Sequence, residues 1–273
     1  MTQTTNDTGA GPPGRRTPDA GVRAGPALPS HGTDTTAPEP AEVALDEVSA
    51  GYDGTTVLHG VTARLPRGAV TAIVGPNGAG KSTMVGVIAG VVRPDSGRVT
   101  TPTATRPALV VQQSGLPEQL PITVRDVVRM GRWARRGPWR RLRRDDHRLV
   151  EDALDHLGIA HLARRRLSTL SGGQRQRALV AQGLVQHSEV LLLDEPAAGL
   201  DVAAQDAIAA ALHSAAADGT AAVHVTHDLA DADRADHCVL LAGGRVLAEG
   251  PPADVLTHEV VDHAWGLDRY RGR

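Results

Sequence analysis

A glycine-rich segment directly after an apolar run holds the first residues that could do chemistry. The segment Gly75–Thr83 has the sequence Gly-Pro-Asn-Gly-Ala-Gly-Lys-Ser-Thr, and the apolar run before it ends at Val74. Glycines in such a loop let backbone N–H groups turn inward around phosphate oxygens, and a helix that begins there adds a favourable dipole. With this spacing, Lys81 reaches the β- and γ-phosphates of a nucleotide and the Ser82 hydroxyl binds Mg²⁺. The segment therefore predicts a nucleoside triphosphate site.

The composition of the chain indicates a chemical constraint on Lys81. Lys81 is the only lysine of the chain, and the other 28 of the 29 Lys and Arg residues are Arg. A lysine ammonium is a compact charge on a flexible stem, whereas an Arg guanidinium is a planar fork. A plain glycine-rich turn is the alternative to a phosphate loop, but it explains neither the motif spacing nor the single lysine.

Two adjacent carboxylates end a second apolar run. Val190–Asp194 has the sequence Val-Leu-Leu-Leu-Asp, and Glu195 and a proline follow. Consecutive residues of a strand point to opposite sides, so the two carboxylates are predicted to have different roles. Asp194 would hold Mg²⁺, directly or through water, and Glu195 would activate the attacking water as a general base. An ordinary turn after a strand is the alternative, and a phosphate loop upstream makes it less favourable.

A third segment repeats the loop-then-helix arrangement. Leu170–Gln174 has the sequence Leu-Ser-Gly-Gly-Gln and stands just before a long helical pattern. It predicts a second helix start that binds an anion. A Ser171 that only caps the helix is the alternative.

In this order and spacing, the three segments resemble the Walker A, signature and Walker B motifs of ABC ATPases, over residues 42–250. The resemblance implies further site residues. Gln112 matches the glutamine loop that senses Mg²⁺ and contacts the membrane subunit, with Gln113 as the alternative placement. His227 matches the switch histidine that contacts the γ-phosphate. Asp201 matches a loop between the two subunits, and Tyr52 the aromatic residue that stacks on adenine, or else packs on the core.

The complete predicted site follows from the motifs and the resemblance together. The catalytic residues are Glu195, His227 and Gln112, and the Mg²⁺ ligands are Ser82, Gln112 and Asp194. The ATP-binding residues are Tyr52, Gly75, Pro76, Asn77, Gly78, Ala79, Gly80, Lys81, Ser82, Thr83, Ser171, Gly172, Gly173, Gln174 and Asp201.

The elements that must position these residues alternate between strands and helices. Short apolar runs predict strands at Ala69–Val74, Ala108–Gln112, Val190–Asp194 and Ala221–Thr226. Apolar residues at three- and four-residue spacing predict helices at Lys81–Ala89, Val124–Met130, Arg148–Leu157, Gly173–Val185 and Val202–Ala217. Cys238–Leu241 and Val246–Ala248 flank Gly243–Gly244 and predict a hairpin.

This alternation predicts an α/β fold with a mostly parallel sheet and covering helices. The resemblance implies a P-loop NTPase (RecA-like) core, an N-terminal antiparallel β subdomain and an α-helical subdomain at about residues 113–178. The predicted domains are a disordered tail at 1–40, where Pro, Gly, Thr and Asp dominate, an ABC ATPase domain at 41–257 and a C-terminal extension at 258–273.

Composition limits the other function classes. The 273 residues are 41% hydrophobic, enough for a sizeable core, and no apolar run approaches the roughly 20 residues that span a bilayer. We expect a soluble protein. A net charge of -2 gives no general attraction to nucleic acid, and the single cysteine, Cys238, favours a reducing compartment.

The resemblance also implies partners and a place of action. It implies a homodimer with ATP between the subunits, an integral-membrane permease, and indirectly a solute-binding protein, on the cytoplasmic face of the membrane. Pro121–Val128 and Met130–Arg132 are similar to the ATPases of zinc and manganese importers, with iron-siderophore or haem importers as the alternative. A non-transport ABC ATPase lacks support, because neither a coiled-coil insertion nor a second cassette is present. A P-loop kinase would leave Leu170–Gln174 unexplained.

Two further sets of residues have weaker interpretations. Residues 125–148 hold 10 Arg and 3 acidic residues together with Trp133 and Trp139, and we interpret them as a docking surface or a solvated helix face rather than a nucleic-acid site. Four histidines are predicted to be surface or core residues without metal, namely His59, His213, His224 and His237. A weak metal sensor at His258 and His263 is a minor alternative for the C-terminus.

Overall fold

The computed structural model describes residues 42–102, 106–111, 121–137 and 141–267. The chain divides into two units, Met1–Ala37 and Pro38–Arg273, and every described residue lies in the second. The predicted tail at 1–40 lies outside the described residues, as do Gln112 and Gln113. In the part of the chain that is described, no helix is both long and apolar enough to cross a bilayer.

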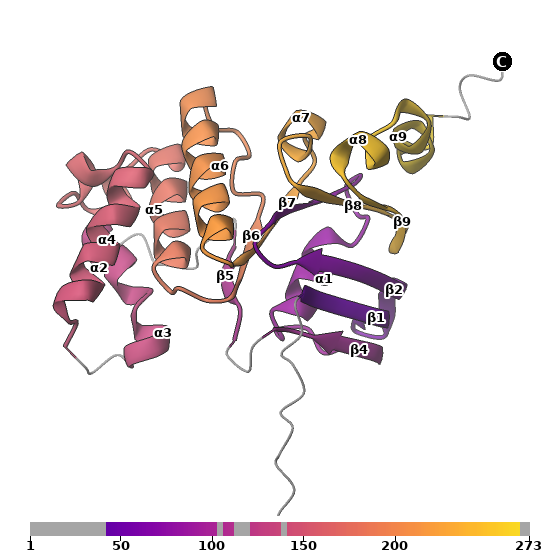
Figure 1. The fold of residues 1–273 in the computed structure, drawn as a ribbon, viewed down its shortest axis with the longest axis horizontal. Coiled ribbons are helices and arrows are strands. Elements are labelled where there is room, and N and C mark those ends of the chain that lie inside the picture. Colours follow the sequence, from indigo (N-terminus) through magenta and orange to yellow (C-terminus); the bar gives the residue numbers. More distant parts are fainter. Residues whose placement is uncertain (1–41, 103–105, 112–120, 138–140, 268–273) are drawn as a thin grey trace, which may run out of the picture. The chain divides into compact units, whose positions relative to one another are not determined.

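A six-stranded sheet forms the centre of this unit (Figure 1). Its first five strands are parallel, and the last one pairs antiparallel with its neighbour across the glycine turn at 243–244, which confirms the predicted hairpin. The spatial order is β5 (Ala108–Val110), β6 (Val190–Asp194), β7 (Ala221–Thr226), β3 (Val70–Val74), β8 (His237–Ala242) and β9 (Arg245–Gly250).

Both faces of this sheet are buried. On β6, Leu191 and Leu193 belong to one hydrophobic core, and Val190 and Leu192 belong to the other. A strand that is covered on both faces needs apolar residues at every position, which is why these strands appear in the sequence as continuous Val, Leu and Ala runs. The two cores place helices on opposite faces of the sheet.

The second sheet is antiparallel, with the order β2 (Thr55–Pro66), β1 (Glu42–Tyr52) and β4 (Ser96–Thr100). Its apolar side chains pack with α1 (Lys81–Ile88) against one face of the main sheet. This sheet is the N-terminal antiparallel β subdomain that the resemblance implied.

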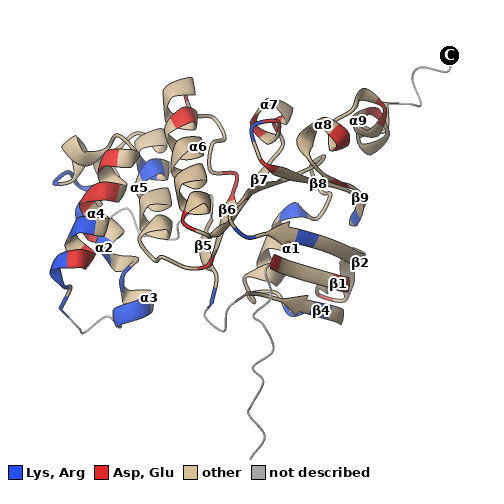
Figure 2. Cartoon of the chain, in the orientation of Figure 1, with Lys and Arg blue, Asp and Glu red and all other residues tan. Residues whose placement is uncertain are grey.

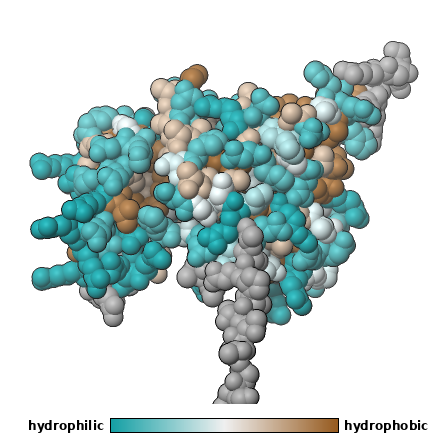
Figure 3. Space-filling view, in the orientation of Figure 1, coloured by the Kyte–Doolittle hydropathy of each residue, from teal (hydrophilic) through white to brown (hydrophobic). Residues whose placement is uncertain are grey.

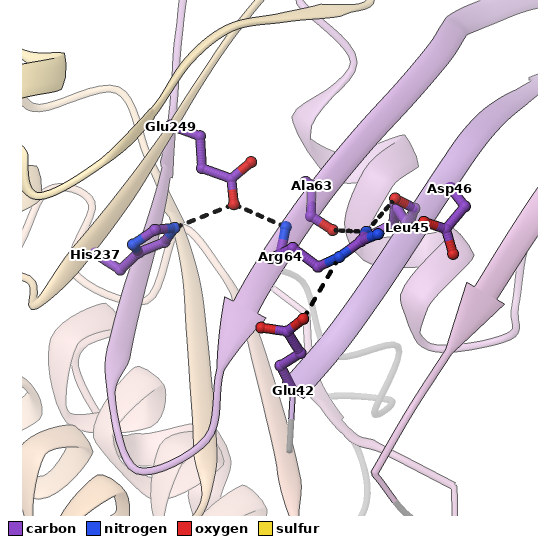
Figure 4. A network of polar contacts seen from close by, with 7 residues as sticks. All are labelled: Glu42, Leu45, Asp46, Ala63, Arg64, His237 and Glu249. Carbon is purple, nitrogen blue, oxygen red and sulfur yellow. Dashed lines mark hydrogen bonds and ion pairs between the residues drawn. The ribbon is translucent and has the colours of Figure 1, made fainter. Parts of the chain in front are cut away.

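A carboxylate network joins the two sheets (Figure 4). The Arg64 backbone N–H on β2 donates to Glu249 Oε1 on β9 at 2.7 Å, and His237 Nε2 on β8 lies 3.3 Å from the same oxygen. The Arg64 guanidinium also pairs with Glu42 and Asp46 on β1. One Glu249 oxygen on β9 therefore contacts both β2 and β8.

Helices of the second core cover the other face of the main sheet. Those of the helical region between β5 and β6 are α2 (Val124–Met130), α3 (Trp133–Arg136), α4 (Arg144–His156) and α5 (Gly172–Leu184), with 3-10 turns at Ala160–Leu162 and Leu167–Thr169. The later helices are α6 (Val202–Ala217), α7 (Leu229–Ala232), α8 (Pro252–Val255) and α9 (His258–Trp265).

Several predicted element boundaries differ from the structure, and two of them matter for the site and the helical region. The helix predicted at Arg148–Leu157 begins four positions earlier, because the Asp146 carboxylate accepts the Arg143 backbone N–H at 2.8 Å and stabilises a first turn that has no apolar periodicity. The strand predicted at Ala108–Gln112 ends at Val110.

The Arg-rich segment is only partly a surface. Arg135 and Arg144 are exposed, and Figure 2 shows basic residues gathered on α3. The space-filling view is mostly hydrophilic over α2, α3 and α4 (Figure 3). Arg132, in contrast, is 5% exposed and pairs with the buried Asp146 at 2.8 Å. The prediction of a docking or solvated face is therefore wrong for Arg132, whose guanidinium is part of the interior. Trp139 lies outside the described residues.

Candidate active site

The carboxyl ends of the parallel strands β3, β6 and β7 bring the phosphate loop, the Asp194–Glu195 pair and His227 to one edge of the sheet. Val74 on β3 is in register with Thr226 on β7, and Val225 on β7 is in register with Asp194 on β6. The residues that follow each strand, beginning with Gly75 and Glu195, therefore lie along the same edge. Ligands of open α/β sheets bind at this edge.

Gly75–Gly80 form a loop that only glycine permits at its turning points. Gly75, Gly78 and Gly80 have φ of 153°, 80° and 101°. A Cβ atom at Gly75 would lie 2.0 Å from the carbonyl oxygen of Leu241, while one at Gly78 would meet nothing within 4 Å. The loop thus approaches β8 closely on one side and leaves open space on the other. Gly80 offers no side chain to the first N–H groups of α1, which stay available to an anion.

Lys81 is almost buried and is satisfied by the loop itself. Its Nζ donates to the carbonyl oxygens of Gly75 at 2.8 Å and Pro76 at 3.1 Å. Burial lowers the pKa of Lys81, and the nearby carboxylates of Glu195 and Asp194 oppose that change. The ammonium is therefore bound to the phosphate loop and is influenced by the charges of the two carboxylates.

Asp194 and Ser82 form the pair that could hold a divalent cation. Burial raises the pKa of Asp194 and the charge of Glu195 raises it further, whereas a hydrogen bond from the Ser82 hydroxyl and the charge of Lys81 act in the opposite direction. Oxygen donors are the ligands that Mg²⁺ prefers. Ser82 is exposed, so its hydroxyl and the Asp194 carboxylate fit Mg²⁺.

Glu195 differs from the strand residue that the sequence pattern predicts. Its backbone has already left the strand, with φ of 48°, although its N–H still donates to Val225 O at 3.2 Å. The separation from Asp194 therefore comes from a left-handed turn and not from strand pleating. His227 Nδ1 lies 3.3 Å from Glu195 Oε1, and both residues line one pocket together with Gly199.

The segment at Ser171–Gln174 starts α5 through a capping box. The Gln174 N–H donates to Ser171 Oγ at 3.3 Å, and the Ser171 N–H donates to Gln174 Oε1 at 3.2 Å. Ser171 and Gly172 are exposed, and a Cβ at Gly172 would meet nothing within 4 Å. This helix start is open to a ligand. However, α5 packs in one core and α1 in the other, so the two helix starts belong to opposite faces of the sheet.

Known proteins resemble this chain along most of its length. The profile of the ABC transporter family matches residues 58–198. The hemin import ATP-binding protein of Thermobifida fusca is 38% identical over 233 residues, which cover 81% of each chain. This chain belongs to the ABC transporter family. The manganese transport system ATP-binding protein of Bacillus subtilis is 35% identical over 230 residues, covering 82% of this chain and 92% of that protein.

Solved structures agree with this assignment. A metal-chelate type ABC transporter in an inward-facing conformation has a TM-score of 0.72 and 28% identity, with 82% of this chain and 89% of that chain covered. The predicted P-loop fold is confirmed, and the chain is an ABC ATPase whose hydrolysis is coupled to transport.

The remaining predicted residues are distributed around this centre. Tyr52, at the end of β1, is 51% exposed, so its ring is free to meet a ligand. Asp201 caps α6, where its carboxylate accepts the Ala204 N–H at 2.8 Å. His258 and His263 lie on α9, and among the described residues no three His, Cys, Asp or Glu side chains are grouped to hold a metal ion.

Thr226 and Asp228, on either side of His227, were missed by sequence reasoning. The Asp228 N–H donates to Thr226 Oγ1 at 3.1 Å, and Asp228 Oδ1 accepts the Ala230 N–H at 2.8 Å. A usable signal was present, because an Asp directly before a helix is a preferred N-cap. Its position immediately after His227 suggests that the cap also fixes the histidine backbone.

Proposed function

We propose that two copies of this chain hydrolyse ATP at shared sites, each made from the phosphate loop of one copy and Ser171–Gln174 of the other. The observation that carries the proposal is the placement of the two anion-binding helix starts, those of α1 and α5, on opposite faces of one sheet. One triphosphate cannot engage both starts of the same chain. A second copy, arranged head to tail, supplies the missing set by two-fold symmetry.

Within each site, the residues have separate tasks. Tyr52 stacks on adenine, and Lys81 with the loop N–H groups binds the β- and γ-phosphates. Ser82, Asp194 and Gln112 hold Mg²⁺, which supplies positive charge against the phosphate oxygens when bound. The other residues of the phosphate loop surround the phosphates, namely Gly75, Pro76, Asn77, Gly78, Ala79, Gly80 and Thr83.

Glu195 is the general base in this proposal. Its carboxylate accepts the proton of the water that attacks the γ-phosphorus, and His227 contacts the γ-phosphate. The 3.3 Å contact between His227 and Glu195 supports a shared role for the two side chains. Asp201 lies between the two copies.

The variant Glu195→Gln tests the base and the dimer together. It keeps the size of the side chain but removes the carboxylate, so hydrolysis should fall by about 10²–10⁴-fold while ATP still binds. A dimer should then accumulate in Mg-ATP, as measured by light scattering. Adding Ser171→Arg, which blocks the exposed start of α5, should restore the monomer. Hydrolysis by Glu195→Gln at the wild-type rate would remove the base assignment, and a dimer that tolerates Ser171→Arg would contradict the shared site.

For transport, the pair of ATPases would drive a membrane permease from the cytoplasmic face, with a solute-binding protein delivering the cargo. We propose a metal ion, zinc or manganese, as that cargo. Support comes from the segments Pro121–Val128 and Met130–Arg132 and from relatives named as manganese and zinc transport ATP-binding proteins, 35% and 36% identical.

A second candidate cargo is haem or a ferric siderophore. Relatives named for hemin import are 38% and 39% identical, and one named for ferric enterobactin transport is 35% identical. Uptake of radioactive zinc, manganese, haem and a ferric siderophore, measured with and without the gene, separates the two. Loss of zinc or manganese uptake alone supports the first candidate, and loss of haem or siderophore uptake alone replaces it by the second.

A further inference from the structure

His224 is a buried histidine next to the loop that carries His227. It lies on β7, is 4% exposed, and its Nδ1 is 3.4 Å from Oδ2 of Asp231 on α7. The Thr226 hydroxyl also donates to Asp231. Burial acts to raise the pKa of Asp231, but hydrogen bonds from His224 and Thr226 and the charge of Arg234 lower it overall. The Asp231 carboxylate is therefore held, as an anion, against the end of β7.

This contact closes around the segment between β7 and α7. Thr226 Oγ1 donates to Asp231 and accepts the Asp228 N–H, so one hydroxyl ties both flanks of His227 to the same carboxylate. These contacts fix the residues on both sides of His227. The His227 side chain reaches Glu195, and Asp231 lines the pocket that both residues share.

The helix α7 depends on such contacts for its position. It spans four residues, and a helix that short has no stability of its own. Ala232 anchors it in the core. Arg234 pairs with Asp206 at 2.8 Å on the surface, where an ion pair contributes little. The contacts of Asp231 with His224 and Thr226 are thus buried polar restraints on α7.

We infer that His224 and Asp231 are positioning residues that hold His227 in place against Glu195 and the γ-phosphate. The inference rests on the proposed function, in which His227 acts on the γ-phosphate. Breaking their contact should misplace His227 and therefore slow hydrolysis. Neither residue is among those assigned to bind the nucleotide, so the affinity for ATP should stay unchanged. A displacement of the order of 1 Å at a reacting group costs about 10²-fold in rate.

The test compares variants of the full chain in single-turnover hydrolysis and in equilibrium binding of a fluorescent ATP analogue. Asp231→Asn and His224→Leu should each reduce the hydrolysis rate by about 10- to 10²-fold, with dissociation constants within about twofold of the wild-type value. His224→Gln keeps a donor for Asp231 and should retain most of the rate. His237→Leu is the matched control for His224→Leu, because it removes a similar contact with Glu249 at 3.3 Å, away from His227.

Combination with His227→Ala separates a positioning role from a general loss of stability. If Asp231 acts through His227, then Asp231→Asn should not slow the His227→Ala variant further. If the rate losses of the two variants multiply in the double variant, the inference is overturned and the proposed function is not. The same holds if Asp231→Asn hydrolyses ATP at the wild-type rate while His227→Ala is slow. A wild-type rate for His227→Ala would instead refute the proposed role of His227, and the inference with it. If Asp231→Asn fails to fold, the comparison of His224→Leu with His224→Gln decides, and equal rates for those two variants would overturn it.

Discussion

Replacing Asp146 by Asn removes the charge from a fully buried carboxylate of the helical region. Asp146 is 1% exposed and accepts from Arg132 Nε at 2.8 Å, Arg136 Nε at 3.1 Å and the Arg143 N–H at 2.8 Å. Arg132 also donates to Val185 O at the end of α5 at 2.6 Å. A single carboxylate therefore connects α3, the start of α4 and, through Arg132, the end of the helix that begins at the signature.

The size of the effect follows from the burial of both partners. Asn keeps the shape of the side chain, but Arg132, 5% exposed, would remain in the interior without its counter-charge. Removing one partner of a buried ion pair costs about 3–5 kcal/mol. At about 2–4 °C per kcal/mol for a domain of this size, the melting temperature should fall by about 6–20 °C. Arg148→Gln is the control, because its pair with Asp145 spans 3.8 Å with side chains 69% and 81% exposed. The free energy of unfolding of that variant should fall by less than about 1 kcal/mol.

Thermal unfolding followed by circular dichroism measures both variants, first at pH 7 and then at falling pH. Burial alone would raise the pKa of Asp146, but the hydrogen bonds from Arg143 and Arg132 and the charges of Arg132 and Arg136 lower it overall. A carboxylate with a lowered folded-state pKa stabilises the protein above its unfolded value of about 3.9 and loses that contribution as the pH falls through the folded value. The difference in melting temperature between wild type and Asp146→Asn should therefore narrow below about pH 4. Equal melting temperatures at pH 7, or a gap that persists in acid, would refute the reasoning.

Three further outcomes are expected at the phosphate loop and in the core. Lys81→Ala should weaken ATP binding, measured by calorimetry, and abolish hydrolysis, because no other described cation donates to the loop carbonyls; a wild-type rate would contradict the loop assignment. Gly75→Ala should abolish ATP binding and lower the melting temperature, since its Cβ would lie 2.0 Å from Leu241 O; the matched Gly78→Ala, with nothing within 4 Å, should retain more of both. Cys238, which is buried and whose pKa is raised to about 12, should resist a thiol reagent at pH 8 until denaturant is added, and rapid labelling of the native protein would contradict its burial.

The parts of the fold that the sequence predicted are those with an uninterrupted pattern. Strands β3 and β6 of the main sheet are continuous, mostly apolar runs, and α1 starts at Lys81 where the glycine spacing requires it. The antiparallel sheet was expected only from the family resemblance. Its register shifts between Leu45 and Val48 and again up to Gly51, and Glu47 has φ of 50°. Such bulges add residues that break the two-residue alternation on which strand prediction depends.

Long-range polar contacts were also beyond sequence reasoning. The run Arg143–Arg144 offers no typical capping residue, so the start of α4 became visible only with Asp146 in place. The sequence left His224 open as a surface or a core residue. It is a core residue, and its partner Asp231 is seven positions away on another element. The pattern of an isolated segment cannot specify which buried polar group another element supplies to it, because that depends on tertiary packing.

The side chains that would meet the γ-phosphate already have partners within the chain. Lys81 is held by two loop carbonyls, and His227 lies against Glu195. A buried ammonium without an acceptor would be costly, so these internal contacts keep the site stable before nucleotide arrives. Phosphate oxygens carry more negative charge than carbonyl oxygens and make stronger, charge-assisted hydrogen bonds. In the proposed function, nucleotide binding would therefore exchange weak partners for stronger ones at Lys81. At His227 the γ-phosphate would add a second contact beside Glu195, so one side chain would touch both the phosphate and the proposed base.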